Sequence, residues 1–436
     1  MRVFSGRFCV GVAAASVALL AAEAFPPLRA QEEAAAEAET FPETAFADVP
    51  AFADALESCW NESADALKRM RRARWETTLP ADEGGRTLHS AYWRGGKIWG
   101  IEAEQIKIEE EKGRAVRLEI MFFNKGDTVA RGGPDGDSGE ALARKARFSE
   151  KAWRDCEAAT RGALAALGDP RRCSIGAGKL RRRAEAWSCG RSVFVLDAEK
   201  NEFVRVIVVP AERFDELTSS AVERVKSGMK LSEILKKRDS GDVFISTVPM
   251  VSQGQKGYCV PATLERVLRY YGIEDLDMHK IAALAGTRAG GGTSVEGLVR
   301  GLGPVLKKSR LKFSEQKMSF SKIRQSVNRG VPLIWTMYST PQYETRMKRL
   351  TAERRGNDSA ADAAARAKRL DAMEPLAFSP ETARKYAHVC LIIGYNSKTK
   401  ELCVSNSWGD YAREQWVRFE DAETVSHGER LHCLKK

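Results

Sequence analysis

One cysteine of this chain precedes a predicted helix, at a place that favours nucleophilic chemistry. Cys259 follows the glycine-rich residues 252–257, and apolar residues at helical spacing continue from it to Gly272 at the C-cap position. Pro261 suits the first helical turn, where its missing N–H costs little. Free backbone N–H groups and the helix dipole favour a thiolate at this end. The sequence therefore predicts a nucleophilic thiol, with a buried structural cysteine as the alternative.

Three further side chains could complete the chemistry of a thiolate. Gln253 lies six residues before the cysteine, in reach to donate an amide N–H to an oxyanion beside the sulfur. His388 begins one predicted strand, and Asn406 ends another near Trp408. An imidazole can take up the thiol proton, and an amide carbonyl can orient that imidazole. The order Gln, Cys, His, Asn therefore predicts attack of a thiolate on a carbonyl carbon.

This order resembles that of the papain-like cysteine peptidases. Residues 406–409, Asn-Ser-Trp-Gly, are identical to the asparagine motif of those enzymes. His388 follows Cys259 by 129 residues (388 − 259), close to the roughly 130–150 residues of papain-type enzymes. Around the cysteine, the chain is similar to the bacteriocin-processing peptidases of family C-39, which also have a glutamine six residues before the cysteine and a helix ending near Tyr-Tyr-Gly. The resemblance covers about residues 245–420.

Two residues depart from the C-39 pattern. Val260 stands where glycine usually follows the cysteine, and Asn406 stands where that family usually has aspartate. An asparagine in this place is the papain pattern. The substrate preference of the leader-processing enzymes therefore does not carry over to this chain.

The resemblance implies an α+β fold, with a papain-like catalytic domain over residues 241–436 whose N-terminal catalytic helix packs on an antiparallel sheet. It implies that Cys259 attacks a peptide carbonyl and that His388 takes the thiol proton, forming an ion pair in the resting state. Asn406 would orient the imidazole, shielded by the nearby tryptophan. Gln253 and the backbone N–H of the cysteine would bind the oxyanion. The expected partner is a protein or peptide substrate, and no metal or organic cofactor is needed.

Two other functions are compatible with the same residues. The triad could transfer an acyl group to an amine, as in transglutaminase-like or amidase relatives. The chain could instead be a binding protein that uses its N-terminal region, where four tryptophans could line a face although core positions are the more usual reading. These are Trp60, Trp75, Trp93 and Trp99. The presence of glutamine, cysteine, histidine and asparagine together favours an enzyme.

The chain has 436 residues, enough for two or three domains with real cores. Arg2 and Arg7 open a segment whose apolar run is too short to span a membrane, so residues 1–30 are predicted to be a secretory signal. We expect an exported protein, periplasmic or extracellular, with no integral membrane segment after cleavage. Residues 31–45 form an Ala/Glu-rich tether, and residues 46–237 are predicted to be a separate N-terminal α+β accessory domain.

The net charge and the cysteine content bear on nucleic-acid binding, on disulfides and on metal binding. The formal net charge of +11 is spread along the chain, and no nucleic-acid motif accompanies it, so a solvated basic surface is the simplest interpretation. Export permits disulfides. Cys173 with Cys189 is the first candidate pair, followed by Cys59 with Cys156. No cysteine pair has zinc-finger spacing, so no metal site is predicted.

Periodicity predicts the elements that hold these residues. In the N-terminal region we expect helices at 50–74, 141–167 and 211–237, a loop at 124–140, and strands that include a hairpin of 192–196 with 203–209. Just before the histidine strand, the charged, alanine-rich residues 341–380 predict a helical insertion. This insertion could be a lid over the cleft or a solvated hairpin.

Overall fold

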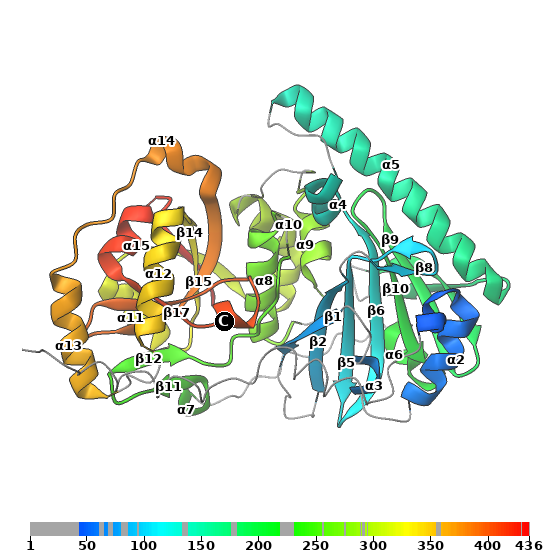
Figure 1. Cartoon of the computed structure of the whole chain (residues 1–436), viewed down its shortest axis with the longest axis horizontal. Coiled ribbons are helices and arrows are strands. Elements are labelled where there is room, and N and C mark those ends of the chain that lie inside the picture. Colours follow the sequence, from blue (N-terminus) through cyan, green and yellow to red (C-terminus); the bar gives the residue numbers. More distant parts are fainter. Residues whose placement is uncertain are drawn as a thin grey trace, which may run out of the picture. The chain divides into compact units, whose positions relative to one another are not determined.

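The computed structural model describes residues 43–436 except 61–64, 69–72, 80–85, 94–95, 133–137, 176–180, 219–230, 255–256, 274–275, 288, 290–292, 294, 355–358, 429 and 436. The predicted signal sequence and most of the tether lie outside the described residues. Residues 41–436 form one compact unit. This unit mixes helices with two large antiparallel sheets (Figure 1). Its division into a separate N-terminal domain and a catalytic domain stays a prediction.

The first sheet has eight antiparallel strands in the order β1-β2-β5-β6-β10-β9-β8-β7. The strands are β1 (Ala73–Leu79), β2 (Arg86–Trp93), β5 (Gln105–Glu111), β6 (Arg114–Asn124), β7 (Arg171–Ile175), β8 (Arg182–Cys189), β9 (Ser192–Glu199) and β10 (Phe203–Pro210), with β3 (Lys97–Ile98) and β4 (Ile101–Glu102) as a small separate hairpin. The helices of this region are α2 (Val49–Cys59), α3 (Asp65–Lys68), α4 (Lys125–Gly132), α5 (Gly139–Leu164), α6 (Phe214–Thr218) and α7 (Leu231–Ile234).

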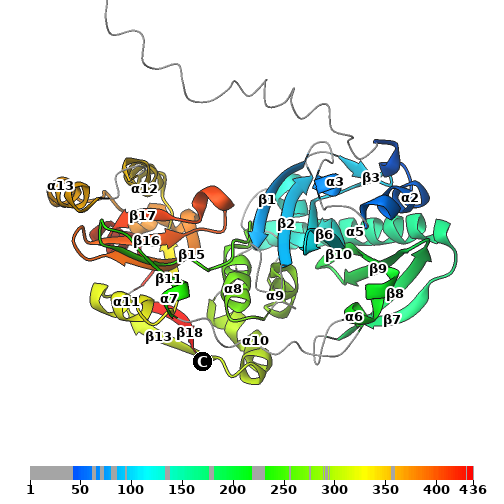
Figure 2. The ribbon, with the colours of Figure 1, turned by 90° about the horizontal axis from the view of Figure 1, so that it is seen from below.

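Strands β9 and β10 are buried on both faces because alternate side chains enter different hydrophobic clusters. Phe194 and Val206 belong to the cluster that receives α2 and α5, whereas Val195 and Ile207 belong to the cluster closed by Phe214 of α6. Figure 2 shows α5 running along this sheet. The hairpin predicted here is confirmed. Its strands are rich in valine and isoleucine because both of their faces are buried, which favours apolar residues at successive positions.

The second sheet runs in the order β11-β12-β15-β14-β18-β13, with β16 paired to β15 and β17 paired to β16. Its strands are β11 (Leu235–Lys237), β12 (Asp242–Ile245), β13 (Lys312–Lys317), β14 (Leu333–Tyr338), β15 (Ala387–Asn396), β16 (Glu401–Ser405), β17 (Gln415–Arg418) and β18 (Arg430–Lys435). The helices are α8 (Cys259–Tyr270), α9 (Met278–Leu284), α10 (Val295–Lys308), α11 (Phe320–Val327), α12 (Pro341–Glu353), α13 (Ala360–Asp371), α14 (Pro380–Ala383) and α15 (Phe419–Val425).

Helix α8 carries the predicted nucleophile and is packed on several sides. Its apolar residues, such as Leu264 and Val267, enter the main core together with strands β14 to β16. The hydroxyl of Thr263 donates to the carbonyl of Val389 on β15 at 3.1 Å. Gly272 follows the helix with a φ of +79°, a conformation that glycine adopts without strain. The predicted helix is confirmed, and it lies against the strand that begins with the predicted histidine.

The helical insertion at 341–380 is present, and its first helix belongs to the core. Helix α12 buries Tyr343, Met347 and Leu350, and it packs beside β17 (Figures 1 and 2). Arg354, directly after α12, forms buried ion pairs with Asp242 and Glu401. These contacts do not fit a detachable lid or a solvated hairpin for α12.

Several predicted elements are wrong in detail. In the range 50–74, where one helix is expected, α2 ends at Cys59, α3 covers only Asp65–Lys68, and β1 begins at Ala73. The loop expected at 124–140 contains α4, because Asn124 caps it: the Asp127 N–H donates to the Asn124 side chain at 2.8 Å. Of the helix expected at 211–237, residues 219–230 lie outside the described residues. Its last residues form strand β11, whose pairing with β12 decides its conformation.

The predicted Cys173–Cys189 disulfide is wrong. Neither cysteine forms a disulfide, and neither do Cys59 and Cys156. Cys173 pairs with Ala184 across β7 and β8, so Cys189 lies five residues further along β8 (189 − 184), about 17 Å at strand spacing. A disulfide requires Cα atoms within about 7 Å. The two thiols also pack against different hydrophobic clusters.

Two further observations bear on the alternatives. Trp60, Trp93 and Trp99 are buried in a core cluster, which leaves them unsuited to an exposed binding face. Within the residues that the structure describes, none of the helices combines the length and the apolar character needed to cross a membrane.

Candidate active site

Cys259 is the first residue of α8, directly after the N-cap residue Tyr258, and it is half-buried. Burial raises the pKa of its thiol. The backbone N–H groups of Val389, Val260 and Cys259 itself act in the opposite direction, with a smaller combined effect. The helix start therefore supplies N–H groups to the sulfur, as the sequence predicts, but the protonated thiol is the favoured form.

His388 is the second residue of β15 and is buried. Its Nε2 lies 2.9 Å from Oδ1 of Asn406, so a proton exchanged with the cysteine would pass through Nδ1. Burial lowers the pKa of His388 to about 4, against opposing contributions from the Asn406 hydrogen bond and the Glu344 charge. The neutral imidazole is therefore favoured.

The raised pKa of Cys259 and the lowered pKa of His388 disfavour the resting thiolate–imidazolium ion pair that the resemblance implies. A thiolate and an imidazolium each lose hydration when buried, so both neutral forms are favoured here. Backbone N–H groups, that of Val389 among them, lower the pKa of the Cys259 thiol, and the ring of His388 is not among the groups that shift it. The arrangement suits an imidazole that removes the thiol proton as the thiol attacks.

Asn406 is held from three sides. Its side-chain oxygen meets His388, its side-chain N–H donates to Oε1 of Gln415 at 2.6 Å, and its backbone N–H donates to Ala412 at 3.0 Å. The indole of Trp408 stacks on the His388 ring with 4.8 Å between centroids. The His–Asn hydrogen bond is thus fixed in orientation and covered by an aromatic ring.

Gln253 is buried in the loop that precedes α8. Its backbone N–H donates to the carbonyl of Ser407 at 2.8 Å, which ties this loop to the residue that follows Asn406. One residue earlier, the carbonyl of Ser252 accepts a hydrogen bond from the hydroxyl of Tyr92 on β2 at 3.1 Å. The four predicted residues thus come from a loop, a helix and the ends of two strands, which the structure brings together.

Sequence reasoning missed several residues that support this site. Gln415 orients Asn406, Tyr92 contacts the Gln253 loop, and Arg266 is buried beside the asparagine loop. Of these three residues, only Arg266 could have been found from the sequence, because a charged residue seven positions after the cysteine lies on the same side of the helix. The others gave none, since strand neighbours are distant in sequence.

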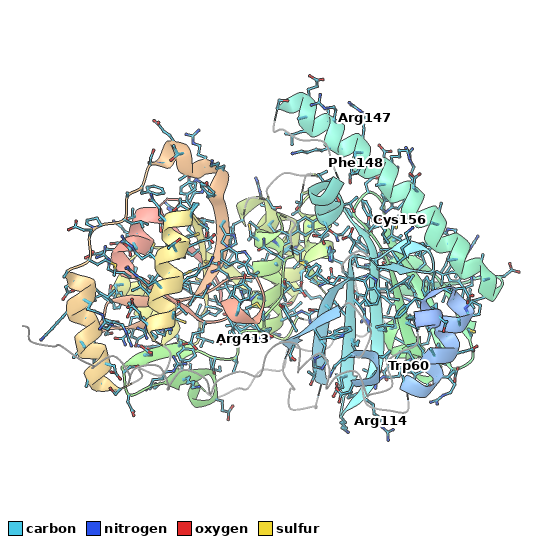
Figure 3. All side chains as sticks on the ribbon, viewed as in Figure 1. Trp60, Arg114, Arg147, Phe148, Cys156 and Arg413 are labelled. Atoms are coloured by element: carbon cyan, nitrogen blue, oxygen red, sulfur yellow. The ribbon has the colours of Figure 1, made fainter. Side chains whose placement is uncertain are left out.

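Glycine is required after the tryptophan. Gly409 has a φ of +110°, and a Cβ atom there would lie 2.7 Å from a carboxylate oxygen of Glu76 on β1. Arg413, labelled in Figure 3, donates to the carbonyls of Val248 and Thr77 from the same turn. Among the described residues, no group of three or more His, Cys, Asp or Glu side chains is arranged to hold a metal ion.

Comparison with known proteins agrees with this geometry in one part of the chain. A search of curated proteins found no match. Residues 245–427, which include Gln253, Cys259, His388 and Asn406, match the family model described as "Peptidase_C39 like family". This match supports a papain-like cysteine peptidase domain of the C-39 type over residues 245–427.

Proposed function

We propose that the protein is an exported cysteine peptidase that hydrolyses peptide bonds with Cys259, His388, Asn406 and Gln253. The observation that carries this proposal is the buried His388–Asn406 hydrogen bond of 2.9 Å under Trp408, beside a cysteine at a helix start. Such a constellation is recognised by geometry and roles.

In the proposed reaction, the Cys259 sulfur attacks the peptide carbonyl while its proton moves to Nδ1 of His388. The side chain of Gln253 and the backbone N–H of Cys259 stabilise the oxyanion. His388 then donates the proton to the leaving amine, the C–N bond breaks, and a thioester remains. A water molecule, deprotonated by His388, attacks the thioester, which releases the acid and restores the thiol.

The test is cleavage of a proteome-derived peptide library by the mature, reduced chain and by its Cys259→Ala variant. We expect new peptide termini with the wild-type chain and none with the variant. If an added primary amine is incorporated in place of water, the reaction is acyl transfer. If neither product forms and a thiol-directed activity probe does not label Cys259, the protein is not a thiol enzyme.

We further propose that residues 46–237 are a permanent accessory part of the enzyme. Three contacts with the C-39-like region support this. Tyr92 donates to Ser252, the ammonium of Lys125 donates to the carbonyl of Thr287, and Arg205 pairs with Asp277 at 2.5 Å. An inhibitory propeptide would leave after cleavage, whereas both partners are buried in the second and third of these contacts.

The accessory role predicts a requirement for Tyr92. A Tyr92→Phe variant loses only the hydroxyl that binds the Ser252 carbonyl, so we expect a lower kcat with the melting temperature nearly unchanged. Release of the N-terminal region by limited proteolysis provides the opposite check. Faster hydrolysis of a small peptide after that release would identify the region as inhibitory.

A further inference from the structure

The fully buried guanidinium of Arg266 is bonded to neutral oxygens of two segments: the glutamine loop (residues 249–254) and the asparagine loop (residues 405–407, beginning at the last residue of β16). Its Nε donates to the carbonyl of Pro249 at 2.8 Å, and its Nη1 donates to the carbonyl of Ser405 at 3.0 Å. Further bonds reach the hydroxyls of Ser405 and Ser407. Among the ion pairs of the described residues, none includes Arg266.

A buried cation without a carboxylate is costly, because the guanidinium loses its hydration and gains only neutral partners. This burial, with a smaller contribution from the charge of Arg413, lowers the pKa of Arg266 to about 9. The side chain still carries its charge at neutral pH. An apolar side chain of similar size would avoid the cost, so packing alone is a poor reason for an arginine at this position.

The acceptors of Arg266 lie in the segments that present the active-site groups. Pro249 precedes Gln253 by four residues, and the two serines stand on either side of Asn406. Arg266 itself follows Cys259 by seven residues, about two helical turns, which places both side chains on the same side of α8. One guanidinium therefore joins the cysteine helix to the glutamine loop and to the asparagine loop.

We propose that Arg266 is a positioning residue, which sets Gln253 and Asn406 relative to Cys259; this inference rests on the proposed peptidase function. The planar fork of the guanidinium presents donors in fixed directions, so it holds the two loops at a defined separation. A lysine would keep the charge but lose this fork.

The first test compares Arg266→Met and Arg266→Lys with the wild-type chain on a cleaved peptide. We expect kcat to fall at least tenfold in Arg266→Met, since a displacement of about 1 Å can cost about 10²-fold in rate. KM should stay within about twofold, because the fully buried side chain of Arg266 is not exposed to a bound peptide. Arg266→Lys should recover only part of the lost kcat.

Val267→Ala is the matched control on the same helix. Val267 is fully buried in the apolar core, and its side chain has no polar atom that could bond to either loop. Its truncation removes core packing, so we expect a lower melting temperature with kcat unchanged for the folded protein. A similar loss of kcat in Val267→Ala would mean that any weakening of α8 has the effect assigned to Arg266.

The second test measures amide hydrogen exchange at Gln253 and Asn406, which bond to Ser407 and Ala412 across the site. We expect faster exchange at these two amides in Arg266→Lys, with the amides of β14 and β15 unchanged. This readout needs no peptidase activity, so it separates this inference from the proposed function. If Arg266→Met does not fold, Ser405→Ala replaces it, because that change removes one acceptor and leaves the arginine in place.

Lower kcat together with faster exchange at Gln253 and Asn406 supports the proposal. Wild-type kcat in a folded variant overturns it, whether or not exchange changes, because the loops would then not depend on Arg266 for catalysis. If the wild-type chain hydrolyses no peptide, the proposed function fails, and exchange alone decides whether Arg266 holds the loops.

Discussion

At the scale of single residues, His388 is central because three neighbours define what it can do. Asn406 occupies its Nε2, Trp408 covers its ring, and burial lowers its pKa to about 4. An imidazole in this setting accepts a proton only transiently. Its orientation and its basicity can therefore be tested separately.

We predict that His388→Ala abolishes peptide hydrolysis and that Asn406→Ala leaves a weakly active enzyme. Loss of a general base typically costs about 10²–10⁴-fold in rate, whereas loss of its orienting partner leaves the base in place. The measurement is kcat/KM on one peptide for both purified variants. Near-wild-type rates in both would show that these residues do not act in the reaction.

The pH dependence of the reaction follows from the same two groups. Because the folded pKa of His388 is lowered to about 4, the imidazole stays neutral down to that pH, and activity should fall only as the pH drops through about 4. The raised pKa of Cys259 means that alkylation by iodoacetamide, which requires the thiolate, should accelerate as the pH rises through the alkaline range. An alkylation rate of Cys259 that stays constant from pH 5 to 9 would instead indicate a resting ion pair of Cys259 with His388.

At the scale of elements, the turn between β16 and β17 connects Asn406 to Gln415 and passes close to β1. Gly409 lies in this turn with positive φ, against the carboxylate of Glu76. Gly428 offers a matched position, since its φ is +82° but the space around it is open. Comparing substitutions at the two glycines therefore separates the cost of positive φ from the cost of a steric conflict with Glu76.

We predict that Gly409→Ala lowers stability and activity more than Gly428→Ala does. Both substitutions cost about 1–3 kcal/mol for a non-glycine residue at positive φ. Only the first also displaces Glu76 and the turn that carries Trp408. Thermal melting and kcat of both variants provide the check, and equal effects would contradict the steric argument. A Glu76→Ala change in the Gly409→Ala background should restore part of the loss.

At the scale of the whole molecule, a buried ionic cluster joins the first sheet to α9. Arg205 is fully buried and lies within hydrogen-bond distance of Asp197, Glu119 and Asp277. Asp277 also accepts the N–H groups of His279 and Lys280 as the N-cap of α9. Burial alone would raise the pKa of Asp277, but the positive charges, that of Arg205 foremost, hold it well below its usual range.

The sign of the pH effect follows from this lowered pKa. Asp277, Asp197 and Glu119 all have folded pKa values below those of the unfolded chain, so their stabilisation is present above about pH 4 and is lost as the pH falls toward the folded values. We predict that Arg205→Met lowers the free energy of unfolding at pH 7 by about 3–5 kcal/mol, because it leaves buried carboxylates without their cation. Melting temperatures from pH 4 to 8 measure this.

In Arg205→Met the pH trend should also change. The unpaired carboxylates would then have raised pKa values, so acidification would neutralise them and the difference from wild type would shrink toward pH 4. Arg346→Met is a suitable control, since Arg346 pairs with Asp421 far along the chain from this cluster. A constant difference at every pH would contradict the ionic explanation.

The sequence by itself determined the local elements of the site. The helix after Cys259 and the strand that begins near His388 follow from periodicities of 3.6 and 2, which neighbouring residues carry. The asparagine motif at 406–409 is likewise contiguous, and the family match over residues 245–427 includes it. Such features depend on interactions between residues that are close in sequence.

Only the tertiary structure decided which groups support the site. Arg266 bonds to Ser405 across 139 residues, and Tyr92 bonds to Ser252 across 160. The same holds for the free thiols of Cys173 and Cys189, whose closeness in sequence does not survive strand pairing. Burial also favours a neutral Cys259 thiol in place of the expected thiolate, because desolvation depends on everything packed around a group, and no single stretch of sequence contains that information.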